Sequence, residues 1–261
     1  MNILDTIVAH KRKEVAERKK TTPVAELEKG KFFADKTLSL KSFLLDENKT
    51  GIIAEFKRKS PSKGVINDKV TVEEVTTAYA KYGASGISVL TDREFFGGSL
   101  DDLLAATINA VPLLRKDFMI DEYQLIEAKA FGAEVILLIA ACLTTAEVKQ
   151  MAATAKNLGM EVLLEVHNEE EFGHICDAVD LVGVNNRNLK TFEVSINTSL
   201  DLINKIPKEK PAVAESGISD VDTIVTLRSA GFKGFLIGEN FMKQASPSVA
   251  FADFVNQLKA K

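Results

Sequence analysis

From residue 51 onward the chain repeats one pattern: a short run rich in Val, Ile and Leu, then a polar or glycine-bearing turn, then a longer segment with helical periodicity. The eight apolar runs are "GIIAEF", "ASGISVLT", "VPLLRK", "AEVILLIA", "MEVLLEV", "DLVGVNN", "KPAVAES" and "FKGFLIG". Several are continuously apolar, as expected for parallel strands that are covered on both faces. The repeat therefore predicts an α/β protein with a single (β/α)8 TIM barrel.

A doubly wound open sheet is the alternative arrangement of alternating strands and helices. Such a sheet normally carries a glycine-rich turn after its first strand, whereas Ser-Pro-Ser-Lys-Gly follows the first apolar run here. Helices are expected over 71–83, 121–132, 144–159 and 219–231, because each segment ends on glycine and the first begins with a capping-box pattern at Thr71 and Glu74. The short helix-to-strand turns fit the barrel.

Residues 1–48 precede the first strand and have helical character, with Ile3, Ile7 and Val15 near one helix face. We expect a helical extension over 1–48 that packs on the barrel, and a catalytic barrel over 49–261. The alternative is that these helices are simply further core elements, and the sequence alone does not separate the two.

Composition excludes several classes of partner. The formal net charge of −4 gives no global cationic field, so neither nucleic acid nor a membrane is expected as a partner. Cys142 and Cys176 lie far apart without a Cys/His cluster, which argues against a disulfide framework and a metal site. No signal sequence or spanning segment is evident. We expect a soluble cytoplasmic protein that requires no obligate protein partner.

Polar residues follow the apolar runs where parallel strands of a barrel would end. In this fold the loops at the carboxyl ends of the strands build the site. The residues at these ends are Glu55, Lys57, Lys116, Glu165, Asn185, Arg187, Glu215 and Ser216. Three carboxylates and three cations are thus predicted to meet at one mouth. Mutual pairing into a salt-bridge network is the alternative reading, and it is compatible with catalysis.

Two of these residues follow apolar segments that would suit them to acid–base catalysis. Lys116 follows "VPLL", so its stem lies along an apolar wall, and it is a candidate general acid toward a carbonyl oxygen. Glu165 ends another apolar run, where burial would suit proton transfer. Phe118 could offer a flat surface to an aromatic substrate, although core packing explains it equally. His167 is interpreted as a polar loop residue.

The turns after the seventh and eighth apolar runs have the glycines that are typical of a phosphate site. Gly217 and Gly238 follow the seventh and eighth apolar runs, and in barrels the backbone of these two loops commonly binds phosphate. Either glycine alone could end a strand for steric reasons. Their paired positions predict an anion site.

Seven ordered segments extend these observations to a resemblance: "IIAEFKRKSPSKG", "SVLTDREFFGGSL", "LLRKDFMIDEYQ", "LLEVHNEEE", "VGVNNRNLKTF", "AESGIS" and "FLIGENFM". With the helical extension before them, the whole chain resembles the indole-3-glycerol phosphate synthase family. Related barrels such as phosphoribosylanthranilate isomerase share the glycine turns but lack the Ser-Pro-Ser-Lys-Gly segment. The resemblance implies closure of the indole ring of 1-(2-carboxyphenylamino)-1-deoxyribulose 5-phosphate, with loss of CO2 and water and without a cofactor.

The resemblance also implies roles for the residues at the strand ends. Lys116 corresponds to the general acid that protonates the ketone oxygen, and Glu165 to the acid–base group of the dehydration. Lys57 corresponds to the lysine that holds the substrate carboxylate, and Glu55 to the carboxylate that orients this lysine. Further residues match positions that bind the carboxylate, the sugar hydroxyls or the phosphate: Asn185, Arg187, Glu215, Ser60, Ser216, Gly217, Gly238 and Glu239. The first three of these, with the two lysines and two glutamates above, are the predicted catalytic set.

Glu239 departs from the pattern, because many relatives carry a small residue there and a carboxylate would repel phosphate.

Two other functions remain as alternatives. A sugar-phosphate isomerase would use Glu165 as base and Lys116 as electrophile, but it leaves the other charges unexplained. A phosphosugar-binding or scaffold protein would have kept the barrel and lost the chemistry.

Overall fold

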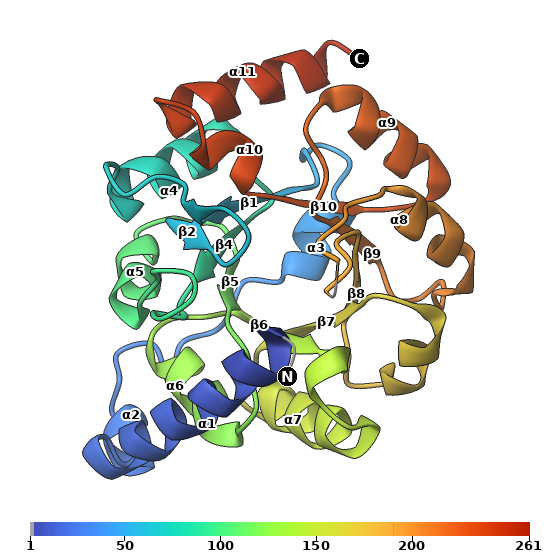
Figure 1. Ribbon diagram of the computed structural model, residues 1–261. Helices are drawn as coiled ribbons and strands as arrows, with labels where there is room; N and C mark the ends of the chain where they lie inside the picture. Colours follow the sequence, from blue (N-terminus) through green and yellow to red (C-terminus); the bar gives the residue numbers. More distant parts are fainter. Residues whose placement is uncertain (1–2, 190) are drawn as a thin grey trace.

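The computed structural model describes residues 3–189 and 191–261, so the first two residues of the expected extension and Lys190 of the "VGVNNRNLKTF" segment lie outside the description. Within these ranges, eight parallel strands close into a barrel in the order β1-β10-β9-β8-β7-β6-β5-β4 (Figure 1). The strands are β1 (Ile52–Phe56), β4 (Gly86–Leu90), β5 (Leu113–Lys116), β6 (Val135–Ile139), β7 (Glu161–Val166), β8 (Leu181–Asn185), β9 (Ala212–Glu215) and β10 (Gly234–Ile237). Each lies within one of the eight apolar runs, and the TIM-barrel prediction is confirmed.

Helices surround the barrel, and the four predicted ones are present as α4 (Val72–Tyr82), α6 (Glu122–Ala130), α7 (Thr145–Asn157) and α9 (Val221–Ala230). The Thr71 side chain accepts a hydrogen bond from the Glu74 amide at 3.2 Å, and a complete capping box forms at Thr144 and Glu147. The other elements after β1 are β2 (Lys59–Ser60), β3 (Gly64–Val65), α5 (Leu100–Ala106), η1 (Ala140–Cys142), η2 (Glu169–His174), α8 (Asn197–Leu202), η3 (Ile203–Lys205), α10 (Glu239–Met242) and α11 (Pro247–Lys259). Of the described helices, none is long and apolar enough to cross a membrane.

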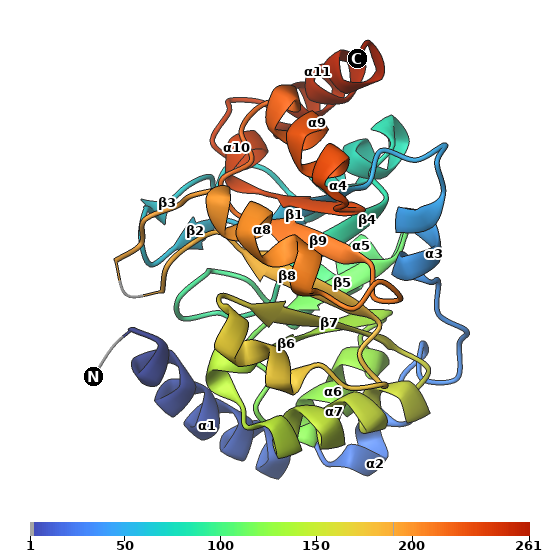
Figure 2. The same ribbon diagram turned by 90° about the vertical axis from the view of Figure 1, so that its right-hand side faces the viewer.

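The barrel interior is filled by apolar side chains and is closed at the end where the strands begin. The inward-facing residues include Ile53, Leu114, Leu137, Leu163, Leu181, Val213 and Leu236. Helix α3 (Leu40–Leu45) lies across this end and inserts Leu40 and Leu44 (Figure 2). Gly86 and Gly234 begin two strands and make room for them, since a Cβ at either position would lie within 3.0 Å of a leucine Cδ1. A ligand can therefore enter only from the opposite end.

The N-terminal segment contributes α1 (Ile3–Thr21) and α2 (Val24–Leu27) before α3. Val15 packs with Tyr123 of α6 in a small buried cluster, and α1 runs beside α6 (Figures 1 and 2). Lys11 is almost fully buried, and its Nζ lies 2.8 Å from Asp92 Oδ2 and 2.9 Å from Asp117 Oδ1. Helix α1 is thus fixed to the barrel by both apolar and ionic contacts.

Candidate active site

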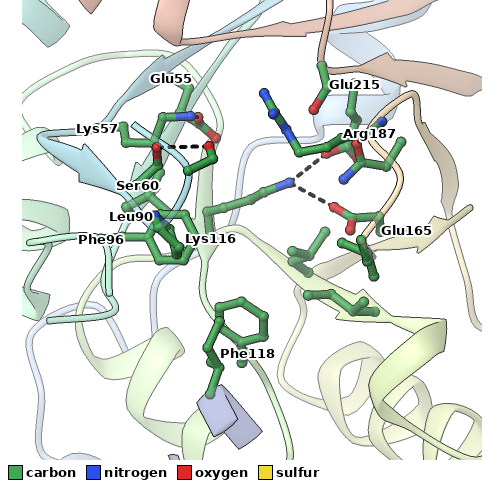
Figure 3. A pocket seen from close by; sticks show the side chains of 18 of the residues that line it. Glu55, Lys57, Ser60, Leu90, Phe96, Lys116, Phe118, Glu165, Arg187 and Glu215 are labelled. Atoms are coloured by element: carbon green, nitrogen blue, oxygen red, sulfur yellow. Dashed lines mark hydrogen bonds and ion pairs between the residues drawn. The ribbon is translucent and has the colours of Figure 1, made fainter. Parts of the chain in front are cut away.

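A cavity opens at the carboxyl ends of the strands. It contains about 1040 Å³ of space, part of it open to solvent. Many of the charged and polar side chains that line it come from five strand ends or the loops that follow: Glu55, Lys57, Lys116, Glu165, Arg187 and Glu215 (Figure 3), and Asn185. Parallel register explains this convergence, since strands that all run one way present their last residues at the same rim.

Lys116 lies at the centre of this rim. Its Nζ donates to Glu215 Oε2 at 2.5 Å and to Glu165 Oε2 at 3.1 Å, and Figure 3 shows the side chain extending between them. Burial disfavours the ammonium, but the carboxylates of Glu215, Glu165 and Glu55 outweigh it and raise the pKa of Lys116 above its usual range. At neutral pH Lys116 is therefore a charged proton donor.

The two glutamates that share Lys116 are not equivalent. Burial opposes ionisation of both side chains. For Glu165, Lys116 and His167 outweigh burial and hold the pKa well below its usual range. For Glu215, burial prevails over Lys116, and the nearby Glu165 carboxylate adds to it, so that the pKa is raised. The pair therefore combines an ionised carboxylate with one that binds a proton readily.

Glu55 and Lys57 form a second pair on the other side of the mouth. They are two residues apart, so they share a face of the chain as it leaves β1, and Lys57 Nζ lies 2.7 Å from Glu55 Oε1. Ser88 Oγ lies 3.4 Å from the other carboxylate oxygen. Gly238 allows this arrangement, because a Cβ there would come within 2.6 Å of Glu55 Oε1.

A second hollow adjoins the cavity and is lined by Gly217 and Gly238, the two glycines that predicted a phosphate site. It is lined by Lys63, Arg187, Ser216, Gly217, Gly238, Glu239, Asn240 and Lys243, with Glu55 and Lys57 at its boundary with the first. Ser216 and Gly217 both have left-handed backbones, with φ of +66° and +77°. Such a conformation is strained for a residue with a side chain. The surrounding structure must therefore hold the Ser216 backbone in it.

Glu239 faces two of the cations of this hollow. Its Oε2 lies 3.8 Å from Arg187 Nη2, and its Oε1 lies 4.0 Å from Lys63 Nζ. The side chain is about a third exposed. The carboxylate thus makes long ion pairs with groups that could otherwise meet an anion.

The opposite wall of the cavity is apolar. Phe118 and Phe96 lie with ring centroids 6.0 Å apart, and Ile3, Leu4 and Ile7 of α1 complete the wall. Sequence reasoning missed Phe96 and the α1 residues as parts of the site. Phe96 stands within the quoted "SVLTDREFFGGSL" segment, which was a usable signal, whereas the apolar face of α1 predicted only packing.

Every residue that the sequence assigned to the site borders one of the two adjoining hollows. Glu55, Lys57, Ser60, Lys116, Phe118, Glu165, Asn185, Arg187, Glu215, Ser216 and Glu239 line the first, and Gly217 and Gly238 line the second. His167 was interpreted as a polar loop residue, but its side chain is only 10% exposed and lies against Glu165. Across the described ranges, no group of three or more His, Cys, Asp and Glu residues could hold a metal ion.

Comparison with known proteins gives a consistent result. A family model described as "Indole-3-glycerol phosphate synthase" matches residues 4–254. Proteins of that name from Bacteroides thetaiotaomicron and Polaromonas sp. are 45% and 44% identical to this chain, and the alignments cover 99% and 96% of it and 99% and 97% of theirs. A tryptophan synthase structure from Pyrococcus furiosus superimposes with a TM-score of 0.61 at 16% identity over 82% of this chain and 99% of that one, a likeness that concerns the fold alone.

Proposed function

The chain belongs to the indole-3-glycerol phosphate synthase family, and we propose that its cavity closes the indole ring of 1-(2-carboxyphenylamino)-1-deoxyribulose 5-phosphate. The products are indole-3-glycerol phosphate, CO2 and water. The chain is thus an enzyme of tryptophan biosynthesis that acts on a small molecule. The reaction balances without an external oxidant or reductant, so it requires no redox cofactor.

One observation carries the assignment of the chemistry. The Lys116 ammonium lies between Glu165 and Glu215 and lines the same cavity as the Lys57–Glu55 pair. The substrate presents an anionic carboxylate and a neutral ketone, and ring closure creates a cationic intermediate. A site for this reaction needs fixed cations for the anion, a proton donor for the ketone and fixed carboxylates for the cation. The cavity offers all three.

In the first step the ring carbon that bears the carboxylate attacks the ketone carbon, and Lys116 donates a proton to the ketone oxygen as it becomes a hydroxyl. The electron pair of the ring nitrogen stabilises the resulting cation. Lys57 holds the substrate carboxylate, and Glu55, at 2.7 Å from the Lys57 Nζ, orients it. Preorganised groups of this kind lower the barrier because they do not have to reorient during the reaction.

In the second step the carbon–carboxylate bond breaks, CO2 leaves, and the bonding electrons return to the ring. In the third step a base takes a proton from the ring carbon beside the nitrogen, the carbon–hydroxyl bond breaks, and the hydroxyl receives that proton and leaves as water, which restores the aromatic indole. We assign Glu165 to the proton transfers of this dehydration, because it contacts Lys116 and lines the cavity. Glu215, Asn185 and Arg187 position the substrate carboxylate and hydroxyls.

The two ends of the substrate fit different parts of the rim. We assign the phosphate to the hollow between Gly217 and Gly238, where Lys63, Lys243 and Arg187 supply positive charge. Ser60, in β2, lines the adjoining cavity. The carboxyphenyl ring is assigned to the wall formed by Phe96 and Phe118, which offers flat apolar surface.

The N-terminal segment belongs to the same functional unit in this proposal. Residues 1–48 are an extension of the barrel over 49–261 rather than an independent domain, because α1 supplies part of the cavity wall through Ile3, Leu4 and Ile7. A cytoplasmic location and the lack of a protein or nucleic-acid partner stay predictions from the sequence.

Fluorescence of the indole product tests the proposal. The purified protein is expected to convert the carboxyphenylamino substrate to a fluorescent indole, and the dephosphorylated substrate is expected to have a higher KM. A protein that forms no indole but isomerises the aminoaldose precursor, phosphoribosylanthranilate, would support the isomerase alternative instead.

A further inference from the structure

His167 lies at the end of β7, two residues after Glu165, and has a carboxylate on each side of its ring. Its Nε2 is 3.3 Å from Glu165 Oε1, and its Nδ1 is 3.3 Å from Glu171 Oε2. The same Glu171 oxygen accepts the backbone N–H of His167 at 2.8 Å, which holds the two residues in register. The Nδ1 contact has hydrogen-bond geometry and the Nε2 contact is an ion pair without it, and a carboxylate beside each nitrogen favours the form of the ring in which both carry protons.

The position of His167 separates it from the substrate. Among the described residues that line the cavity, Glu165 is present and His167 is not. The ring is 10% exposed and contacts Glu165 Oε1, whereas Lys116 binds the other oxygen, Oε2. Glu165 is therefore held between two cationic groups, one in the cavity and one behind it.

No equivalent group supports Glu215. Its Oε2 shares Lys116, and its Oε1 has no hydrogen-bond partner in the described part of the chain. Two other ionisable groups lie around Glu165 and Glu215. Glu55 acts on Lys116. Cys142 faces Glu165 and Glu171, and burial, together with these carboxylates, raises the pKa of its thiol to about 12. Cys142 therefore stays a neutral thiol, and His167 is the second cation of the group.

The charge of His167 follows from its neighbours. Burial disfavours the imidazolium, but Glu165 and Glu171 outweigh it and raise the pKa of His167 to about 10. At neutral pH the ring is therefore positive and adds to the effect of Lys116 on Glu165. Without it, two glutamates would compete for one ammonium, and of the contacts that distinguish them a hydrogen bond from Asn185 to Glu165 would remain.

We propose that His167 is a positioning residue that, as an imidazolium behind Glu165, fixes Glu165 as the ionised glutamate and leaves Glu215 as the glutamate that is more readily protonated before the reaction begins. This inference deepens the proposed function, and its kinetic readout rests on that function. The protonation states of Glu165 and Glu215 are therefore set before the substrate binds. Glu165 then enters the reaction as a base, whereas Lys116 keeps its own proton for the ketone oxygen.

The direct test uses the wild-type protein and does not depend on activity. Nitrogen NMR of the histidine-labelled protein distinguishes imidazolium from neutral imidazole for the three histidines of the chain. One ring, assigned by its loss in His167→Gln, is expected to keep both protons up to about pH 9, well above the ordinary histidine pKa. If His167 is neutral at pH 8, the proposal is wrong, whatever reaction the protein catalyses.

The kinetic test compares His167→Gln with the matched control His174→Gln. His174 is seven residues away, and its ring contacts two backbone carbonyls, of Glu171 and Leu143, at 3.0 and 2.9 Å. The acidic limb of the kcat profile of His167→Gln is expected to move up by about one pH unit, which near that limb lowers kcat about tenfold. KM is expected to stay within about twofold, and the His174→Gln profile to match the wild type.

A purely structural role for His167 would lower thermal stability without moving the pH limb. Glu171→Gln provides a second variant, because it removes one carboxylate from the ring and keeps the imidazole. It is expected to lower the pH at which His167 loses its second proton in the NMR titration. Superimposable pH profiles in wild type and folded His167→Gln, or an unchanged His167 titration in Glu171→Gln, would overturn the inference.

Discussion

Strand β5 and the residues that follow it contribute charged side chains to two neighbouring clusters. The two clusters differ in how their charged groups are paired. We define the outer cluster as Lys11, Asp92, Arg115, Asp117 and Glu127, and the inner cluster as Lys116, Glu165 and Glu215. Successive residues of a strand point to opposite faces, so Arg115 and Asp117 face α1 and α6 while Lys116 faces the barrel mouth.

Every carboxylate of the outer cluster has a buried cation beside it, although Asp92 Oδ2, 2.8 Å from Lys11 Nζ, makes an ion pair without hydrogen-bond geometry. Arg115 Nη2 lies 2.8 Å from Glu127 Oε2 and 3.1 Å from Asp117 Oδ2. Asp117 also accepts from Thr91 Oγ1 at 2.7 Å and from the Phe118 amide at 2.8 Å. Its members are nearly fully buried, and their charges satisfy one another. Such a cluster holds α1 in place but has little capacity left for a ligand.

The inner cluster is unsaturated. Two carboxylates share one ammonium, and Glu215 Oε1 has no hydrogen-bond partner among the described residues. Lys116 remains 15% exposed at the cavity. The same residue types therefore stabilise the fold in one place and remain available for chemistry in the other. The difference is that the cations of the outer cluster are fully buried among their carboxylates, whereas in the inner cluster one partly exposed ammonium serves two carboxylates at a cavity.

The largest effect is expected at the inner cluster. Lys116→Ala removes the proposed proton donor and should lower kcat by about a thousandfold or more, the range of a lost general acid. The thermal midpoint should change little, because Glu165 and Glu215 can bind protons or water from the cavity. Product fluorescence and thermal unfolding by circular dichroism measure the two effects. Near-normal turnover would remove Lys116 from its assigned role.

The matching change in the outer cluster should have the reverse effect. Lys11→Met leaves Asp92 and Asp117 buried without their ammonium, and breaking such a group costs about 3 kcal/mol of unfolding free energy. We expect kcat within a few-fold of wild type and a raised KM, because α1 carries part of the cavity wall. Urea unfolding checks the stability, and exposed Lys13→Met is the control. Equal losses of kcat in Lys11→Met and Lys116→Ala would erase the distinction between the clusters.

Acid should weaken the outer cluster at a definable pH. Burial opposes the Asp117 carboxylate, but Lys11 and Arg115 outweigh it and lower the pKa of Asp117 to about 2. The stabilisation is fully present above the unfolded-state pKa of about 3.9 and is lost as the pH falls toward 2, a change of about 2 kcal/mol. Urea unfolding between pH 5 and 2 should show a shallower pH dependence for Asp117→Asn. Parallel curves for the two proteins would contradict this assignment.

The smallest effect is expected at the phosphate hollow. Glu239→Ser removes a carboxylate that pairs weakly with Arg187 and Lys63, and it should lower the substrate KM about two- to fivefold while kcat is unchanged. The effect should shrink in high salt because the groups are partly exposed. Steady-state kinetics at two ionic strengths measures it. A higher KM in Glu239→Ser would mean that the carboxylate organises the hollow instead of competing with phosphate.

The sequence predicted the barrel and the inner cluster for the same physical reason. Each strand lies in a run rich in apolar residues, and an ionisable residue at or near the end of the run, such as Glu55 or Lys116, must lie at the common rim of a parallel barrel. Local pattern and topology together were sufficient for these positions.

The outer cluster and His167 could not be predicted in this way. Lys11 stands in the charged run "HKRKE", which is typical of a solvated helix face, and its burial depends on Asp92 and Asp117, which lie far away in the sequence. His167 precedes a short acidic segment and has the pattern of an exposed loop. Its burial depends on the side chain of Glu171 folding back onto it. Both cases rest on tertiary contacts that leave no periodic signal.

A crystal structure of Lys116→Ala with the carboxyphenylamino substrate bound would locate each end of the substrate in the two adjoining hollows. We predict that the phosphate lies between Gly217 and Gly238, that the carboxylate meets Lys57, and that the ketone oxygen points to the space left by the Lys116 side chain. Substrate bound outside the two adjoining hollows, or with its ketone turned away from position 116, would contradict the account.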